Sequence, residues 1–144
     1  MPESSRPPSS SARRGRVDRR EVAAIFAGAA VGTLLRVALG RWMAADPAAW
    51  PWDTFAVNVV AAFTLGYVIT RPPARRPPGY RLPFLGTGFC GGLSTFSTMQ
   101  VEVLHMFDAG AYGLAAGYTA ASVAAGYGAV HFAIAAARGA RTAR

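Results

Sequence analysis

The sequence predicts an all-α membrane protein with four transmembrane helices, the third of which is broken near the middle of the membrane. Of the 144 residues, 52% are apolar and only 15% are charged, a balance typical of membrane bundles. Four apolar stretches approach or exceed the about 20 helical residues that cross a bilayer. The third stretch carries glycine pairs and hydroxyl side chains at its centre, and glycines weaken a helix there.

Two basic tails flank a single predicted membrane domain, residues 21–138. Residues 1–20 are rich in proline, serine and arginine and cannot bury a core, so we expect a disordered tail. Residues 139–144 form a short basic C-terminal tail. The N-terminal tail has no aromatic residues or fold to support nucleic-acid binding, so no nucleic-acid partner is predicted. The single cysteine, Cys90, excludes an internal disulfide.

The first predicted span, residues 22–43, combines a close-packing motif with a charge. Gly28 and Gly32 form a G-x-x-x-G pair, which lets another backbone approach closely. Arg36 lies one further turn along the same face. An arginine this far into a span costs at least about 2.5 kcal/mol unless it snorkels or finds a partner. Arg36 therefore either snorkels to the near interface or places a positive charge at an anion-attracting vestibule.

The second predicted span, residues 54–70, has one strongly polar side chain at its middle, Asn58. Trp50 and Trp52 precede this span and are typical of aromatic anchors at the membrane interface. Thr54 and Asn58 share a helical face. A buried amide offers two N–H donors, so Asn58 can either clamp a neighbouring helix or bind an anion.

The third predicted span, residues 82–107, contains the break, expected near 90–94. A break at membrane depth frees backbone N–H and C=O groups, which are costly unless they are satisfied. Such a break is tolerated where protein, water or an ion meets those groups, as in transporters and channels. Past the break, Thr95, Thr98 and Glu102 fall on one helical stripe. Glu102 is therefore either a paired structural carboxylate or part of a polar track.

The fourth predicted span, residues 112–137, is rich in alanine and glycine and carries Tyr118 and Ser122 one turn apart. His105 and His131 lack the spacing of metal ligands. The sequence contains no nucleophile–base–acid set, P-loop or nucleotide fingerprint. No enzymatic activity is predicted.

The distribution of arginine predicts the orientation of the chain. Four spans place both termini on one side, together with the loop between the second and third spans. Nearly all the arginines lie in these three segments, whereas the opposite side has Arg41 among the acids Asp46, Asp53 and Asp108. By the positive-inside rule, both termini of this multi-pass protein of the cell membrane are cytoplasmic. The bias is too strong for a chain that inserts equally both ways.

The run from Gly88 to Thr98, G-F-C-G-G-L-S-T-F-S-T, closely resembles the third-helix signature of the Fluc/CrcB fluoride channels. The G-x-x-x-R that ends at Arg36 and the D-T-F-A-V-N that ends at Asn58 add support, the latter resembling that family's G-T-x-x-x-N. The resemblance covers about residues 25–137. It implies a fluoride-selective channel subunit that lets fluoride leave the cytoplasm passively and so lowers its toxicity, working as an antiparallel dimer in the lipid bilayer.

The resemblance also implies the residues of the site. A structural Na⁺ would be held at the dimer centre by the backbone carbonyls of Gly91 and Ser94, and Arg36 would lie at the vestibule. Unwound carbonyls are hard oxygen ligands that suit a small cation. Fluoride needs closely placed hydrogen-bond donors to replace its water. The residues that match the fluoride pathway are Asn58, Phe96, Ser97, Thr98, Met99, Glu102, Tyr118 and Ser122.

Several positions depart from the family pattern. Met99 stands where the family has its second pore phenylalanine, and Asp53 stands where it has a glycine before the threonine. Ala61 and Ala62 replace a usual Gly-Ser pair, and Gly126 replaces a frequent serine. Together with the strong orientation bias, these changes suggest one half of a heterodimer, paired with an oppositely oriented paralogue.

Two other classes of membrane protein fit the length. A small four-helix proton-coupled multidrug exporter would need Glu102 as its embedded carboxylate, in a different helix from the first-helix glutamate of those exporters. A non-transporting membrane scaffold gives no reason for a polar, broken third span.

Overall fold

The computed structural model describes residues 18–43, 49–71 and 79–142. Within these ranges all regular structure is helical, which confirms the all-α class. In chain order the elements are α1 (Arg19–Trp42), α2 (Trp52–Thr70), η1 (Leu82–Cys90), α3 (Gly91–Leu93), α4 (Phe96–Asp108) and α5 (Tyr112–Thr142). Most of the predicted N-terminal tail, including all its residues up to 17, lies outside the described residues.

Three helices are long and apolar enough to cross a membrane by length and composition, and they match the first, second and fourth predicted spans. Their ranges are Arg19–Trp42, Trp52–Thr70 and Tyr112–Ala140. α5 continues through residues 139–142, which were predicted to belong to the C-terminal tail. Alanine and arginine, both present there, have high helix propensities. The third predicted span is divided among shorter helical pieces.

The N-terminus of α1 is fixed by a side-chain cap. The Asp18 carboxylate accepts a hydrogen bond from the backbone N–H of Arg20 at 2.9 Å. This hydrogen bond holds the pKa of Asp18 below its usual range. The Tyr80 hydroxyl donates to the other Asp18 oxygen at 3.1 Å, so the start of α1 lies beside the start of η1.

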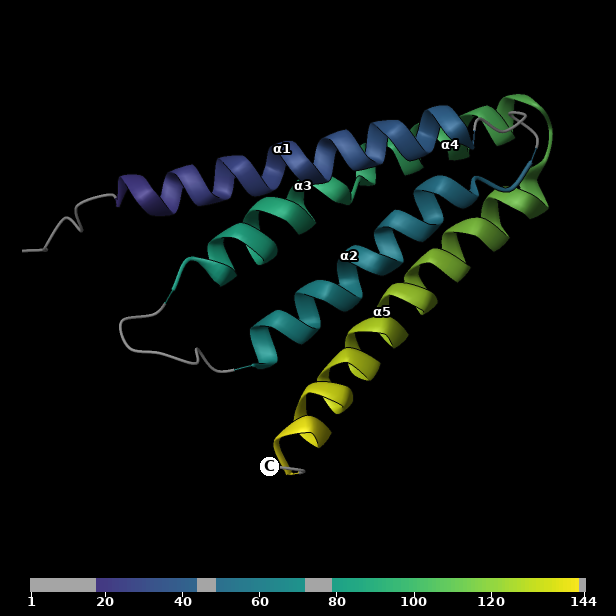
Figure 1. Ribbon diagram of the computed structural model, residues 1–144. Helices are drawn as coiled ribbons and strands as arrows, with labels where there is room; N and C mark the ends of the chain where they lie inside the picture. Colours follow the sequence, from purple (N-terminus) through teal and green to yellow (C-terminus); the bar gives the residue numbers. More distant parts are fainter. Residues whose placement is uncertain (1–17, 44–48, 72–78, 143–144) are drawn as a thin grey trace, which may run out of the picture.

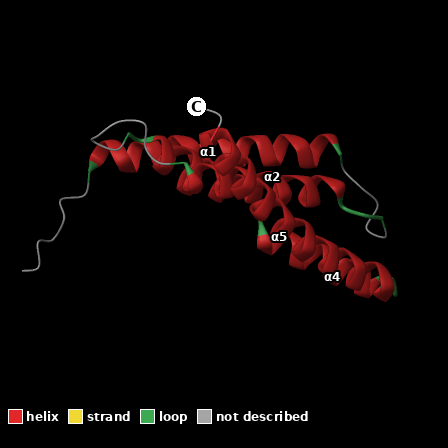
Figure 2. Ribbon diagram, turned by 90° about the horizontal axis from the view of Figure 1, so that it is seen from below, coloured by secondary structure: helices red, strands yellow, loops and turns green. Residues whose placement is uncertain are grey.

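The helices form two packed sets (Figure 1). α1 runs along η1 and α3, while α2 runs along α5, and the contact between α2 and η1 joins the two sets. Seen from below, α4 lies toward one end of the molecule beside part of α5 (Figure 2). The η1 helix has the wider π-helical winding and contains Pro83 in its first turn. It continues directly into α3, because Cys90 and Gly91 both keep right-handed helical dihedral angles.

α1 and the segment formed by η1 and α3 touch through backbone atoms. A Cβ placed on Gly32 would press on the carbonyl oxygen of Phe89 and lie 2.8 Å from the backbone nitrogen of Leu93, closer than real Cβ atoms come. The same crowding holds for Gly28 on α1 and for Gly88 and Gly92 on the facing segment. The G-x-x-x-G pair predicted to admit another backbone does so here, with a second pair opposite it.

The helical path is interrupted at two residues between α3 and α4. Ser94 (φ −72°, ψ 151°) and Thr95 (φ −150°, ψ 117°) are extended, and α4 starts at Phe96. The Thr95 side chain accepts a hydrogen bond from the backbone N–H of Thr98 at 3.2 Å and so caps α4. The interruption therefore lies at the C-terminal edge of the predicted range 90–94, and Gly91 and Gly92 remain helical.

Two apolar clusters pack on either side of this interruption. One joins α2 to the end of the η1–α3 segment through Val57, Ala61, Cys90 and Leu93. The other joins α4 to α5 through Met99, Met106, Ala115 and Tyr118. Cys90 is buried in the first cluster.

Candidate functional site

Asn58 holds the interruption from α2. Its side-chain N–H donates to the Thr95 carbonyl at 3.1 Å, and its side-chain oxygen accepts from the Thr95 backbone N–H at 2.8 Å. Both polar groups of one extended residue are thus satisfied by a single amide, as buried backbone requires. Of the two roles open to Asn58, the structure displays the clamp, and one amide hydrogen is left for another acceptor.

An open groove of about 300 Å³ runs between α2 and the η1–α3 segment beside this clamp. Asn58, Gly91 and Ser94, all predicted site residues, line it together. Ala61 and Ala62 form part of its wall. The structure therefore brings the predicted amide donor and the predicted carbonyl ligands to one place.

Arg36 approaches the same segment from α1. Its Nε–H donates to the Gly92 carbonyl at 3.2 Å, and the Thr33 hydroxyl lies 3.4 Å from the same oxygen. Arg36 is half-buried. The predicted vestibule arginine thus has a backbone partner at the C-terminal end of α3.

Hydroxyl groups complete the interruption. The Ser94 hydroxyl donates back to the Cys90 carbonyl at 2.8 Å. The Thr95 hydroxyl donates to the Thr98 hydroxyl at 2.9 Å and lies 3.4 Å from that of Ser97. These bonds keep the hydroxyls of the signature close to the backbone that they cap.

Glu102 lies where α2, α4 and α5 meet. One carboxylate oxygen accepts a hydrogen bond from the Thr54 hydroxyl at 2.5 Å, and the other accepts one from the Tyr118 hydroxyl at 2.7 Å. Tyr118 is fully buried and Thr54 nearly so. Of the two roles left open for Glu102, the structure shows the paired carboxylate.

Phe96 and Met99, both predicted to line the fluoride pathway, have different surroundings. Phe96 is 74% exposed at the start of α4, whereas Met99 is 7% exposed and packs with Met106 and Tyr118. Within one chain, Met99 is therefore a core residue and Phe96 projects outward.

Two buried polar atoms near Tyr118 have no hydrogen-bond partner among the described residues. They are the Ser122 hydroxyl and the indole nitrogen of Trp50. The Trp50 ring packs edge-on against Tyr118, with ring centroids 5.4 Å apart. Such groups are costly to leave unpaired, so they indicate positions where water or a ligand can be accepted.

The oxygen groups available for a cation are backbone carbonyls. Among the described residues no group of three His, Cys, Asp or Glu side chains is placed to hold a metal ion. Around the interruption the carbonyls of Cys90, Gly92 and Thr95 accept the hydrogen bonds given above. The carbonyls of Gly91 and Ser94 take part in none of these contacts, so they fit the predicted Na⁺ ligands.

Residues 23–134 match the family model described as CrcB-like protein, Camphor Resistance (CrcB). The chain belongs to the CrcB family. It is 61% identical over 117 residues to the fluoride-specific ion channel FluC 1 of Mycolicibacterium paratuberculosis, covering 81% of this chain and 89% of that protein. The proteins of the same name from Mycobacterium bovis and Frankia casuarinae are 56% and 40% identical; these matches cover 81% and 79% of this chain and 89% and 93% of those proteins.

Membership in the CrcB family, together with the three long apolar helices, makes this a multi-pass membrane protein. Thr54 and Trp50 contact the site of this CrcB protein but were not among the site residues predicted from the sequence. Thr54 had a detectable signal, because it lies one turn from Asn58 on the same face. Trp50 was interpreted as an interfacial anchor, and its packing against Tyr118 is a long-range contact with no local signature.

Proposed function

We propose that this CrcB-family chain is a subunit of a fluoride-selective channel that lets fluoride leave the cytoplasm passively. The observation that carries the proposal is the 61% identity, over 81% of the chain, to a protein named as a fluoride-specific ion channel. Because that protein and the other relatives given above are named as channels, they also support the prediction that this chain is not an enzyme.

In this proposal, the pieces before and after the interruption together form the third of four membrane crossings, and a polar path follows α4. Hydroxyls of Thr54, Thr98 and Tyr118 and the spare N–H of Asn58 supply donors along it. Fluoride is small and strongly hydrated, so donors spaced along a path can replace its water without a deep binding well. The negative charge of Glu102 already has two hydroxyl donors, and an entering anion would compete for those same hydrogens.

We assign the cation site to the carbonyls of Gly91 and Ser94. A bound Na⁺ would supply fixed positive charge at the centre of the assembly. The residues fit it because both carbonyls lie at the end of a helical segment, one of them on extended backbone. One chain offers few such oxygens, so the proposed site needs a second subunit.

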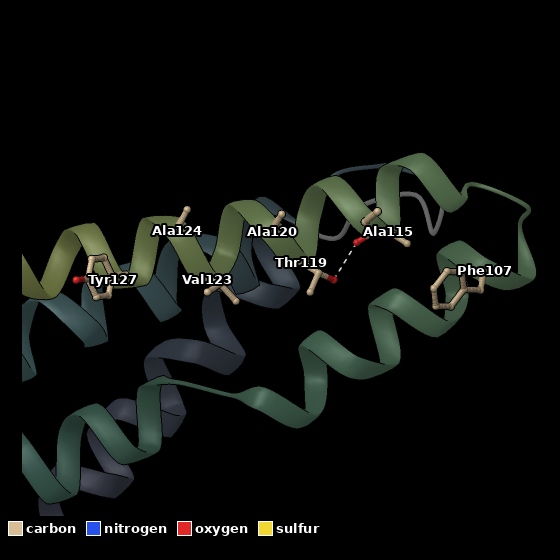
Figure 3. Close-up of a pocket in the computed structure, with 8 residues that line it drawn as sticks. Phe107, Ala115, Thr119, Ala120, Val123, Ala124 and Tyr127 are labelled. Carbon is tan, nitrogen blue, oxygen red and sulfur yellow. Dashed lines mark hydrogen bonds between the residues drawn. The ribbon is translucent and has the colours of Figure 1, made fainter.

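The second subunit in this proposal is an oppositely oriented paralogue. A groove of about 760 Å³ between α4 and α5 is lined mainly by small side chains, as surfaces that admit another membrane helix are (Figure 3). Its walls include Ala116, Ala120 and Ala124, with Phe107 at one end and Tyr127 at the other.

The orientation in this proposal follows from the arginines at the helix ends. Chain order places the start of α1, the end of α2, the start of η1 and the end of α5 on one side. The described arginines there include Arg19, Arg20, Arg71, Arg81 and Arg138. The positive-inside rule makes this side, and both termini, cytoplasmic. If the channel is an antiparallel dimer, a chain of fixed orientation needs a different, oppositely oriented partner chain, which is the reason for proposing a heterodimer.

The exporter alternative is not favoured. The relatives are named as fluoride channels, and Glu102 is held by Thr54 and Tyr118 at the junction of three helices.

The proposal is tested by fluoride efflux from liposomes, read with a fluoride electrode, using this chain alone, an oppositely oriented paralogue alone and the two co-expressed. We expect fast efflux from the co-expressed pair and little from either chain alone. Chloride-loaded liposomes serve as the selectivity control. Efflux from this chain alone would overturn the heterodimer, and no fluoride efflux from any preparation would overturn the channel.

A further inference from the structure

Arg36 has an unusual partner for a charge in a membrane span. It extends from α1 to the interruption, where its Nε–H donates to the Gly92 carbonyl at 3.2 Å. Among the described residues, no carboxylate forms an ion pair with it. A guanidinium with only a backbone partner at this depth is a costly arrangement that must have a structural reason.

That reason lies in the carbonyl that Arg36 meets. A helix leaves its last carbonyls without amide donors, because the residues four positions on are no longer helical. Gly92 is in the last turn before the extended residues Ser94 and Thr95, so its carbonyl has lost its helical donor.

We propose that Arg36 is a positioning residue that caps the helical segment ending at Leu93 through its Nε–H. Together with the Thr33 hydroxyl, which donates to the same oxygen at 3.4 Å, it occupies the Gly92 carbonyl. Arg36 is the closer donor, and it fixes the last turn and the direction in which the neighbouring Gly91 and Ser94 carbonyls are presented. Its positive charge is not what the site requires. The part of this inference that concerns transport rests on the proposed channel function, whereas the part that concerns the cap does not.

The chain length of glutamine makes the inference testable. In arginine the Nε follows Cβ, Cγ and Cδ, and in glutamine the amide nitrogen occupies the same place. Glutamine can therefore donate to the Gly92 carbonyl without a charge. Lysine has a methylene at that place and carries its charge one atom further out, and methionine has the length without any donor.

The experiment compares Arg36→Gln, Arg36→Lys and Arg36→Met by thermal unfolding in detergent and by fluoride efflux at low and high ionic strength. Efflux is measured with the oppositely oriented paralogue co-expressed. We expect Arg36→Gln to unfold near the parent temperature and to retain efflux within about threefold. Arg36→Lys and Arg36→Met should unfold earlier and lose about tenfold or more, as the loss of a hydrogen bond to a buried carbonyl predicts. The same changes at Arg41, which is exposed near the end of α1, are the matched control and should alter neither readout.

A charge at a vestibule predicts the reverse order. Arg36→Lys would then keep efflux, Arg36→Gln would lose it, and the loss would shrink at high salt because salt screens exposed charges. That order overturns the inference, as does an Arg36→Gln variant that unfolds as early as Arg36→Met, or a series in which all variants match the parent. If no preparation carries fluoride, the channel proposal fails, and the order of unfolding temperatures still decides the cap.

Discussion

Asn58 shows how one side chain can replace the backbone partners that a helix loses. The side-chain amide of Asn58 donates to the carbonyl of Thr95 and accepts from its N–H. The extended residue therefore has both backbone hydrogen bonds, like a paired residue in a β-sheet. This pairing links α2 to the junction of α3 and α4. The same contact holds the remaining amide hydrogen beside the groove lined by Gly91 and Ser94.

We therefore expect Asn58→Leu, which keeps the volume but removes both hydrogen bonds, to destabilise the protein by about 2–4 kcal/mol, since two backbone groups lose their partners. Thermal unfolding in detergent measures this effect. Val60→Leu, at an exposed position of the same helix, is the control and should leave the unfolding temperature unchanged. Equal unfolding temperatures for both variants would rule out the clamp.

The Glu102 junction makes a second prediction at this scale. Tyr118→Phe leaves one carboxylate oxygen without its donor and is expected to cost about 1–3 kcal/mol. Tyr127→Phe removes a hydroxyl from a position of α5 that is 68% exposed and is the control. Unfolding measured for Tyr118→Phe, Thr54→Val and the double variant should show coupling, because both hydroxyls serve one carboxylate. Strictly additive effects would contradict the shared role.

Met99 provides a third prediction. Because Met99 is nearly buried against Met106 and Tyr118, Met99→Phe should overpack the cluster and cost about 1–3 kcal/mol. Leu104→Phe, at a position of α4 that is 58% exposed, is the control and should be tolerated. A Met99→Phe variant as stable as the parent and faster in fluoride efflux would instead place this side chain on the open path.

At the scale of elements, the packing of α1 on the η1–α3 segment depends on the absence of side chains. Gly32→Ala would drive a methyl group into the backbone of Phe89 and Leu93, so we expect the two elements to separate, with a loss of about 1–3 kcal/mol. Gly113→Ala on α5 meets no atom within 4 Å and should be neutral or slightly stabilising, since alanine favours helix. Similar unfolding temperatures for the two variants would refute the contact.

The helices could be predicted from the sequence more readily than the way they meet. Apolar length predicted three of the long helices, and glycines with hydroxyls predicted an irregular segment in the third span. The exact place of the interruption depends on contacts from elsewhere: α1 packs against Gly92 and keeps it helical, and Asn58 pairs with Thr95. Local sequence alone predicts the break at the glycine pair Gly91-Gly92, because glycine weakens a helix. The contacts that keep this pair helical come from residues far away in the chain.

The candidate site divides in the same way. Asn58, Gly91 and Ser94 were expected together and line one groove. The partner of Arg36 could not be predicted, because a backbone carbonyl leaves no trace in the sequence. Glu102 was expected on a polar stripe, and Tyr118 was named with it, but only the packing of α2 against α5 brings Thr54 to the same carboxylate.

At the scale of the whole molecule, the protein exposes a large apolar surface, including Phe26, Phe96, Val123 and Tyr127. Lipid can cover most of it, but the groove between α4 and α5 is lined mainly by the small side chains that let another helix approach closely. We expect Ala120→Phe to weaken association with the co-expressed paralogue without lowering the stability of the isolated chain. Ala135→Phe, exposed further along the same helix, is the control.

Chemical cross-linking in membranes and co-purification measure the association. Loss of pairing in Ala120→Phe but not in Ala135→Phe is the expected result. Pairing that survives in both variants would place the partner on another face.

The backbone contact between α1 and the η1–α3 segment also limits how this protein can evolve. Where two side chains meet, a harmful substitution can be compensated by a smaller neighbour. Here Gly32 faces backbone atoms of Phe89 and Leu93, which no substitution can make smaller. A selection for recovered fluoride tolerance, started from Gly32→Ala, should therefore return glycine at the same codon rather than suppressors elsewhere.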